Sequence, residues 1–492
     1  MEITIQSEAK FNLEEEVAKV ENAKQIISNS NLTDDQHVRT SKAKIQKVPA
    51  FLRERSKSRE YYSPKLLSIG PIHHGKDNVK VGEQYKRKWT AMYLSRAKKE
   101  QQGDWRIIDE YTKIKDQIVN EVIKQCYGED VIEEEHKENN YEPLAWMLFI
   151  DGCSVLEFMD KALQKQKELN IKIDQLILMH QDMLLLENQI PFKLLQLLCP
   201  EEKDLSNSML HFLELHNMVP ESAKIRHTLP ISSQPTHLLD YLRNKILCDD
   251  VQTAIYVPRQ QEKSRLCAAL RNKRIDSLRK IAKEAAFYVL RKKKGKDKPL
   301  HAKKKNEWPR QRNIQELKAA GITVTTLEDE NIRNIRFGSD CFFFGRLYLP
   351  QVIVDDSTAI TYMNLIAYEM CPDFENDFAI SSYLAFLDSL IDQKDDVKEL
   401  RWAGILHNNL GSDEEVAGLF NTITTDLVPD PSAYSAVREK IGEHCKRRTK
   451  TWMAEFTYTH FQSPWSVLAL VAAILVLGLT CVQTYYTIPH SK

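Results

Sequence analysis

Hydrophobic residues recur at helical spacing through much of the first half of the chain. The pattern predicts one helix over about 82–99 and another over about 105–126. Two later segments, 144–159 and 176–187, are apolar around most of a helical circumference. Helices of that kind are typical of the core of a sizeable bundle. The pattern therefore predicts a large helical domain.

The hydrophobic period changes after residue 312. Short apolar runs rich in β-branched and aromatic residues follow one another, which is typical of strands. They are ITVTT (322–326), IRNIRF (332–337), FFFGRLYLP (342–350) and QVIVD (351–355). Helical spacing then returns in TYMNLIAYEM (361–370) and SSYLAFLDSLI (381–391). The predicted fold class is mainly α, a large helical domain with a small β-sheet, followed by a C-terminal transmembrane helix.

The last part of the chain predicts that transmembrane helix. Residues 456–491 contain no Asp, Glu, Lys or Arg, and Val467–Val482 is an apolar run. Trp465 stands before the run, and Tyr485 and Tyr486 stand after it. A helix from Trp465 to Tyr485 is about 30 Å long, the thickness of a bilayer core, with aromatic residues at both interfaces. A buried core helix is the alternative, but the aromatic ends and uncharged flanks favour contact with membrane lipid.

Charge flanking the apolar run predicts its orientation. Lys446, Arg447, Arg448 and Lys450 precede it, whereas only His490 and Lys492 follow it. Basic residues collect on the cytosolic side of a membrane. We therefore expect a single-pass protein of the plasma membrane or an endomembrane, with its large domain in the cytosol.

These patterns divide the chain into four parts. Residues 1–42 are a polar, loosely ordered arm, and 43–460 form a single, mostly helical domain. Residues 463–486 are the predicted anchor, and 487–492 are a short tail. The domain contains a basic insertion at 291–312, RKKKGKDKPLHAKKKNEWPRQR, which we expect to be mobile.

Composition narrows the possible chemistry. The 492 residues include 69 basic and 69 acidic side chains, so no global charge draws the protein to nucleic acid. The basic insertion has three possible roles: a solvated loop, a contact with anionic lipid, or a patch for nuclear import or nucleic-acid binding. The 9 cysteines contain no C-x-x-C pair, which argues against a disulfide scaffold or a zinc module.

Two segments resemble known ligand sites but depart from them. Residues 70–76 fit the spacing of a phosphate loop, but Pro71 removes an N–H group and Asp77 replaces the Ser or Thr that binds magnesium. His211 and His216 are spaced so that a helix turns them to different faces. We therefore predict no cofactor, no metal and no small-molecule substrate.

The most unusual local feature is the run DMLLLENQIPF (182–192), in which polar residues follow an apolar stretch. Pro191 disfavours the helical conformation of the preceding residue, so a helix breaks here and another begins. Asn188 and Gln189 can donate hydrogen bonds to carbonyls at the helix end. We interpret Asp182, Glu187, Asn188, Gln189 and Pro191 as a buried structural motif.

A hydrolase is the alternative to that structural interpretation. Glu187 is a candidate catalytic carboxylate, and Asp355 and Asp356 follow a predicted strand where a hard cation could bind. The aspartates are explained more simply as a cap of the next helix. The sequence contains no G-x-S-x-G motif, dinucleotide loop or kinase motif set.

Several of these motifs, in order, resemble those of the plant family known as domain of unknown function 247. They include VPAFLRERSKSREYYSPKLLSIGPIHHG (48–75), CSVLEF (153–158), DMLLLENQIPF, HLLDYLR (237–243), FGRLYLPQVIVDD (344–356) and NLIAYEMC (364–371). The family usually has a Met-Glu-x-x-Lys pattern after the opening, and this chain has GEQYK at 82–86. The resemblance implies a plant membrane-associated protein with no established enzymatic activity.

The preferred hypothesis is a non-enzymatic protein that binds a protein partner in recognition or signalling. An unrecognised hydrolase that uses Glu187, Asp355 or Asp356 is the alternative, and a soluble nuclear factor that uses the basic insertion is a third. The sequence does not name the partner.

Overall fold

A computed structural model describes most of the predicted domain. The described residues are 44–54, 58–97, 106–132, 140–162, 166–214, 234–247, 312–327, 331–339, 344–374, 377–425, 427–446, 472–473, 475–480 and 483. The predicted arm at 1–42 lies outside them, as does the basic insertion apart from Arg312.

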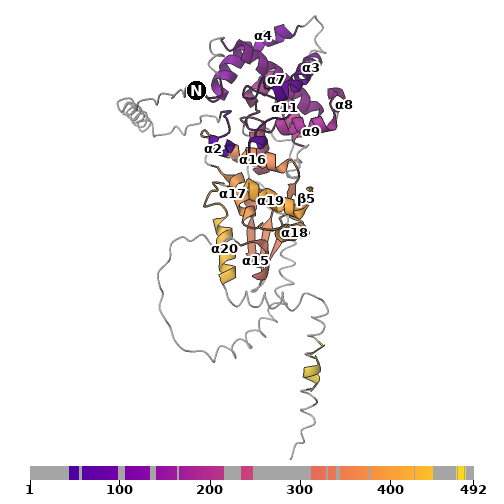
Figure 1. Ribbon diagram of the computed structural model, residues 1–492, viewed down its shortest axis with the longest axis vertical. Helices are drawn as coiled ribbons and strands as arrows, with labels where there is room; N and C mark the ends of the chain where they lie inside the picture. The colour runs from indigo at the N-terminus through magenta and orange to yellow at the C-terminus, as the bar shows by residue number, and fades with distance from the viewer. Residues whose placement is uncertain are drawn as a thin grey trace, which may run out of the picture.

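The first part of the fold is helical and occupies the upper half of Figure 1. Its α-helices are α2 (Ala50–Arg53), α3 (Lys80–Ala97), α4 (Ile107–Gln117), α5 (Lys124–Cys126), α7 (Glu142–Lys161), α8 (Gln166–Leu169), α9 (Ile173–Asp182), α10 (Phe192–Leu198), α11 (Glu202–Glu214) and α13 (Leu238–Leu247). A π-helical turn at Ile118–Ile123 joins α4 to α5.

Helix α7 is the centre of this first part, as its apolar circumference predicts. It packs against α3, α4, α10 and α11. Gly152 permits the approach of α10, because a Cβ atom there would lie 2.3 Å from Leu198 Cδ1. The predicted helices at 82–99, 105–126 and 144–159 are therefore confirmed to within a few residues at each end, apart from the π-helical turn in the second.

The second part combines helices with short strands. Its helices are α15 (Ile314–Ala319), α16 (Thr358–Glu369), α17 (Ala379–Asp388), α18 (Lys394–Trp402), α19 (Asp413–Ile423) and α20 (Ser435–Lys446), with a 3₁₀ turn at Ile332–Asn334. Its strands are β1 (Ile322–Thr326), β2 (Arg336–Ser339), β3 (Gly345–Leu349), β4 (Val352–Val354) and β5 (Leu406–Asn408). The prediction of a mainly helical fold with a small sheet is confirmed.

The strands form two small sheets. Strand β3 lies between β1, which is parallel to it, and β2, which is antiparallel. Residues of β3 alternate between buried and partly buried positions, so Leu347 and Leu349 face the core. Strand β4 pairs in parallel with β5, and the hydrophobic pattern did not predict β5.

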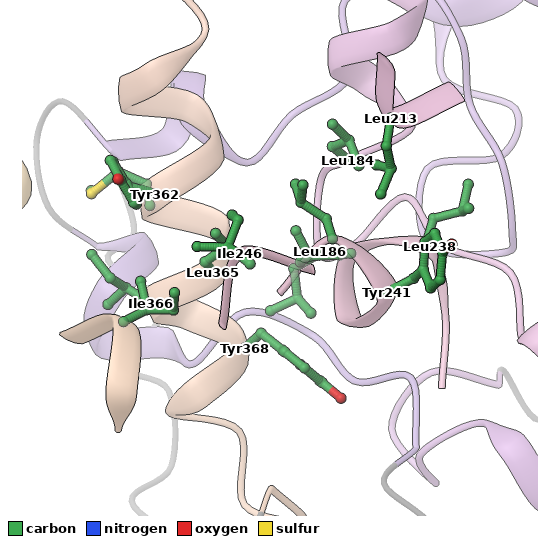
Figure 2. Packing of buried hydrophobic residues seen from close by; sticks show 14 of the residues in the cluster. Leu184, Leu186, Leu213, Leu238, Tyr241, Ile246, Tyr362, Leu365, Ile366 and Tyr368 are labelled. Carbon is green, nitrogen blue, oxygen red and sulfur yellow. The ribbon is translucent and has the colours of Figure 1, made fainter. Parts of the chain in front are cut away.

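Leucine and tyrosine side chains from both parts meet at a junction. Figure 2 shows Leu184, Leu186 and Leu213 of the first part facing residues of α13 and α16. The residues on those two helices are Leu238, Tyr241, Ile246, Tyr362, Leu365, Ile366 and Tyr368. All of them belong to one continuous cluster of buried residues, so the two parts share a core.

Short polar side chains order the beginnings of two C-terminal helices. Ser412 Oγ accepts a hydrogen bond of 3.1 Å from Glu415 N and caps α19, as the SDEE pattern at 412–415 predicts. Glu415 Oε2 accepts from Gly411 N at 3.1 Å, one residue earlier than in an ideal capping box. The N-cap residue of α16 is Ser357, whose side chain makes no capping hydrogen bond. Asp355 instead orders the turn before α16, where its Oδ1 accepts from Ser357 N at 2.9 Å.

The expected fold class has to be corrected at the C-terminal transmembrane helix. Within the described residues, no helix is both long enough and apolar enough to span a bilayer. Trp465, Tyr485 and Tyr486 lie outside the described residues.

The shared core predicts that a single substitution at the junction destabilises the whole domain. Leu365 of α16 is fully buried, so Leu365→Ala leaves a cavity that lowers the free energy of unfolding by about 2–5 kcal/mol. Chemical denaturation followed by circular dichroism measures the change. Ile177→Ala, at an exposed position of α9, is the control and changes stability by less than about 0.5 kcal/mol. Two separate transitions, only one of them shifted by Leu365→Ala, would contradict a shared core.

Candidate functional site

The run that sequence analysis singled out is a buried, irregular segment. Helix α9 ends at Asp182 instead of continuing to 187, and every residue from 182 to 190 is buried. Buried backbone outside helices and strands must find hydrogen-bond partners elsewhere, because water cannot reach it. We call residues 182–191 the polar segment. Residues 61–70, which we call the opening segment, lie against it and supply many of those partners.

Asp182 fixes the start of the opening segment. Its carboxylate accepts hydrogen bonds from three consecutive backbone N–H groups, those of Lys65, Leu66 and Leu67, at 2.7–2.8 Å. Burial raises the pKa of Asp182 to about 6, whereas the three N–H groups act to lower it. The Asp182 side chain therefore fixes the backbone of residues 65–67, as a neighbouring strand would do in a sheet.

Asn188 continues this pairing two residues further along the opening segment. Its Oδ1 accepts from Ile69 N at 2.8 Å, and its Nδ2 donates to Leu67 O at 2.9 Å. The same Nδ2 donates to Asp182 O at 2.8 Å, which satisfies a carbonyl at the end of α9. Asn188 is fully buried, and its amide group takes the place of a neighbouring strand for residues 67–69.

Gln189 links the polar segment to α13. Its Nε2 donates to Met183 O at 2.7 Å and Leu185 O at 2.8 Å, and its Oε1 accepts from Leu239 N at 3.2 Å. The last bond satisfies an N–H group in the first turn of α13, which has no partner within the helix. Pro191 is the extended N-cap residue of α10, so a new helix begins after the break, as predicted.

Glu187 faces the opposite way, toward the beginning of the described chain. Its Oε1 accepts from Val48 N at 2.8 Å and also forms an ion pair with Arg53 of α2. His73 Nε2 lies 3.2 Å from Glu187 Oε2. Burial, with Lys76 and Arg53 nearby, lowers the pKa of His73 to about 3, so this imidazole is neutral at pH 7. Both carboxylate oxygens thus have neighbours within the protein.

Sequence reasoning missed three side chains that complete the site. Asn364 of α16 accepts from Leu186 N at 2.8 Å and donates to Tyr61 O at 2.8 Å, which joins both segments to the second part. Lys86 of α3 is fully buried and lies 2.6 Å from Asp151 Oδ1, while Asp151 Oδ2 accepts from Gly70 N at 2.8 Å.

The signal for Lys86 was present in the GEQYK motif. Glu83 Oε1 lies 2.6 Å from Lys86 Nζ, the i, i+3 contact that this spacing permits. Burial acts to lower the pKa of Lys86, but Asp151 and Glu83 outweigh that effect and raise it. The signal for Asn364 was weaker, since one amide in an apolar helix does not identify its partner.

The carboxylates proposed for a hydrolytic site, Glu187 and Asp355, do not share neighbours. Asp355 Oδ1 accepts from the Ser357 backbone and from the hydroxyl groups of Ser357 and Thr358, in the turn that precedes α16. Glu187 lies instead with Val48, Arg53 and His73. Within the described ranges, no group of three or more His, Cys, Asp or Glu side chains is placed to hold a metal ion. His211 is described, but His216 lies outside.

The resemblance to a phosphate loop at 70–76 has a structural explanation. Gly70 N donates to Asp151, so this N–H group is not directed toward a bound phosphate. Gly70 has a φ angle of +74°, and a Cβ atom there would lie 2.5 Å from the carbonyl oxygen of Gln189. The glycine is therefore required where the opening segment passes the polar segment.

The chain belongs to a plant protein family that is described as having an unknown function. Residues 45–479 match the DUF247 family, described as "plant protein of unknown function". The UPF0481 protein At3g47200 of Arabidopsis thaliana is 26% identical over 440 residues, which cover 86% of this chain and 82% of the relative. A second UPF0481 protein of that plant, At3g02645, is 22% identical over 476 residues, which cover 86% of each chain. No solved structure matches the chain significantly.

The contacts of Asn188 predict a large effect of its removal. Asn188→Ala deprives Ile69 N, Leu67 O and Asp182 O of partners inside the core, so we expect a loss of about 3 kcal/mol in unfolding free energy. Urea denaturation measures the loss. Asn421→Ala, at an exposed position of α19, is the control. Equal stability of the two variants would show that the side chain is not needed to hold the opening segment.

Buried histidines predict a loss of stability in mild acid. Burial lowers the pKa of His73 and His237 to about 3 and that of His180 to about 4. The unfolded chain binds these protons near pH 6.5 and the folded chain does not, so stability falls as the pH drops below about 6.5. The slope is at most about 1.4 kcal/mol per pH unit for each histidine. Asp182, with its raised pKa, opposes this trend between about pH 4 and 6.

Unfolding free energies at pH 7.5, 6.5 and 6.0 test this dependence. His180→Gln should reduce the slope, because one of the three groups is removed. A stability that rises from pH 7.5 to 6.0 would contradict the assignment of neutral, buried histidines.

Proposed function

We propose that the protein works by binding another protein and not by catalysis. One support is that the polar groups in the polar segment serve its own backbone. Asp182, Asn188 and Gln189 bond to main-chain atoms, and Glu187 is held by Val48, Arg53 and His73. The neighbours of Glu187 differ from those of Asp355, which weighs against a shared hydrolytic centre.

The observation that carries the proposal is an exposed apolar patch on α4 and α7. Ile108 and Trp146 are 50% and 39% exposed, and Ile107 lies beside Ile108. The Trp146 ring lies 5.0 Å from that of Tyr111 and 5.7 Å from that of Phe149. An exposed tryptophan beside two aromatic rings, with exposed isoleucines on the helix packed against its own, is typical of the energetic centre of a protein interface.

Proximity labelling with the full-length chain in plant cells tests the proposal. We expect a reproducible set of neighbouring proteins, and Ile108→Asp should reduce their enrichment at least tenfold because a charge is then buried at the interface. Ile177→Asp is a matched control, since Ile177 on α9 is also 50% exposed. Circular dichroism verifies that both variants are folded. No reproducible neighbours, or equal loss in both variants, would contradict the proposal.

A further inference from the structure

The exposed residues of α4 and α7 form one continuous apolar surface. Ile107 and Ile108 precede Tyr111 by four and three positions, so they lie toward the same side of α4. The rings of Tyr111 and Trp146 meet edge-on at 5.0 Å, which places this side of α4 beside Trp146. Pro143, one turn before Trp146 on α7, is exposed as well. We call Ile107, Ile108, Pro143 and Trp146 the apolar patch.

Three cations near the apolar patch already have acidic partners. The ion pairs are Arg106 Nη2 with Asp109 Oδ1 at 2.8 Å, Lys113 Nζ with Glu110 Oε1 at 2.6 Å, and Lys115 with Glu142. These charges are compensated within the protein and are worth little to a partner at an exposed position. The patch therefore suits the apolar face of an occupant, such as an amphipathic helix, more than a charged segment.

The beginning of the chain, outside the described residues, has the sequence of such an occupant. Leu13, Val17, Val20 and Ile27 are spaced so that a helix places them on one face, and most residues between them are charged or carry amides. A helix of about 15 residues is marginal in water, because most helical stability in proteins comes from packing of the apolar face. Residues 13–27, which we call the amphipathic segment, therefore need an apolar surface to fold against.

The described chain begins beside the helices that carry the apolar patch. Ile45 N donates to Cys126 O at 2.8 Å, and Gly128 N donates to Ile45 O at 2.9 Å. Cys126 is the last residue of α5, which the π-helical turn joins to α4. Ile45 is also buried, so this point of the chain is held firmly at one end of the helical unit formed by α4, the π-helical turn and α5.

The connection between the amphipathic segment and Ile45 has the length that this geometry requires. From Cys126 back to Ile108 the helical unit is about 27 Å long. A flexible chain as long as residues 28–43 has an average end-to-end distance of about 20–24 Å. A tether that matches its span gives the highest effective concentration, of the order of 1 mM. The C-terminal apolar run starts from a less favourable place, because α20 and α4 lie toward opposite ends of the molecule (Figure 1).

We propose that the amphipathic segment folds as a helix on the apolar patch of the same chain and covers it until a protein partner takes its place. The inference rests on the proposed function, and it adds a regulation of that binding site. Docking removes the apolar face of the segment and the side chains of Ile108 and Trp146 from water together. A partner then binds only the uncovered fraction of the molecules, so its apparent affinity is reduced by that fraction.

Hydrogen–deuterium exchange of the full-length protein, with mass spectrometry of its peptides, tests the docking. We expect the backbone amides of residues 13–27 to exchange at least tenfold more slowly than those of an unstructured chain. Val20→Asp in the segment and Ile108→Asp in the patch should each abolish this protection, because each places a charge in an apolar contact. Valine and aspartate have similar helix propensities, so Val20→Asp acts on the contact and not on the helix itself.

Each of these variants has a matched control. Asn22→Asp adds the same charge to the segment, but a helix turns residue 22 to the face opposite Val20. Ile177→Asp adds the same charge to α9, at a position as exposed as Ile108. Both controls should keep the protection of residues 13–27. Circular dichroism verifies that every variant is folded.

Rapid exchange of residues 13–27 in the unmodified protein would overturn the proposal, as would protection that survives Ile108→Asp or that Ile177→Asp removes equally. Protection that is lost on dilution would also overturn it, in favour of contact with a second copy of the chain. In proximity labelling, Val20→Asp should raise the enrichment of the neighbours that depend on Ile108, because the patch is then uncovered. If residues 13–27 exchange freely while those neighbours are still labelled, the inference is wrong and the proposed function stands. Protection without reproducible neighbours would instead contradict the proposed function, and with it the regulatory role of the segment.

Discussion

The structure depends on hydrogen bonds from buried side chains to the backbone of two irregular segments. The polar segment and the opening segment cross the interior without forming a helix or a sheet, although neither can expose its amide groups to water. Asp182 and Asn188 take the place of a neighbouring strand, and Asn364 connects both segments to α16. The same segments contribute leucines to the junction between the two parts of the fold. One polar network therefore fixes the register of the opening segment and the position of the second part.

Sequence reasoning was accurate where a local pattern determines the structure. The apolar circumference of α7, the Ser412 cap and the start of α10 after Pro191 follow from interactions within a few positions of the chain. The hydrogen bonds that Asn188 and Gln189 donate to carbonyls at the end of α9 were also predicted correctly. The end of α9 was expected near residue 187, whereas the helix ends at Asp182.

The other partners of the buried polar side chains could not be read from the sequence, because they are backbone groups far away in the chain. Asp182 bonds to residues more than a hundred positions earlier, and Asn364 bonds to Tyr61, which lies 303 positions away. The C-terminal span that was expected from the apolar run and its aromatic ends is not found among the described helices.

The network also explains how an interior segment can shape the surface. Glu187 is buried, yet it contacts both Arg53 of α2 and His73 of the loop at 70–76, and so it holds these two elements side by side. The account predicts that the amide hydrogens of Leu67 and Ile69 exchange with solvent only through global unfolding, although they belong to no helix or strand. Native-state hydrogen exchange measures this directly. Exchange of these two amides as slow as that of the α7 core supports the account, and exchange as fast as that of exposed loops would contradict it.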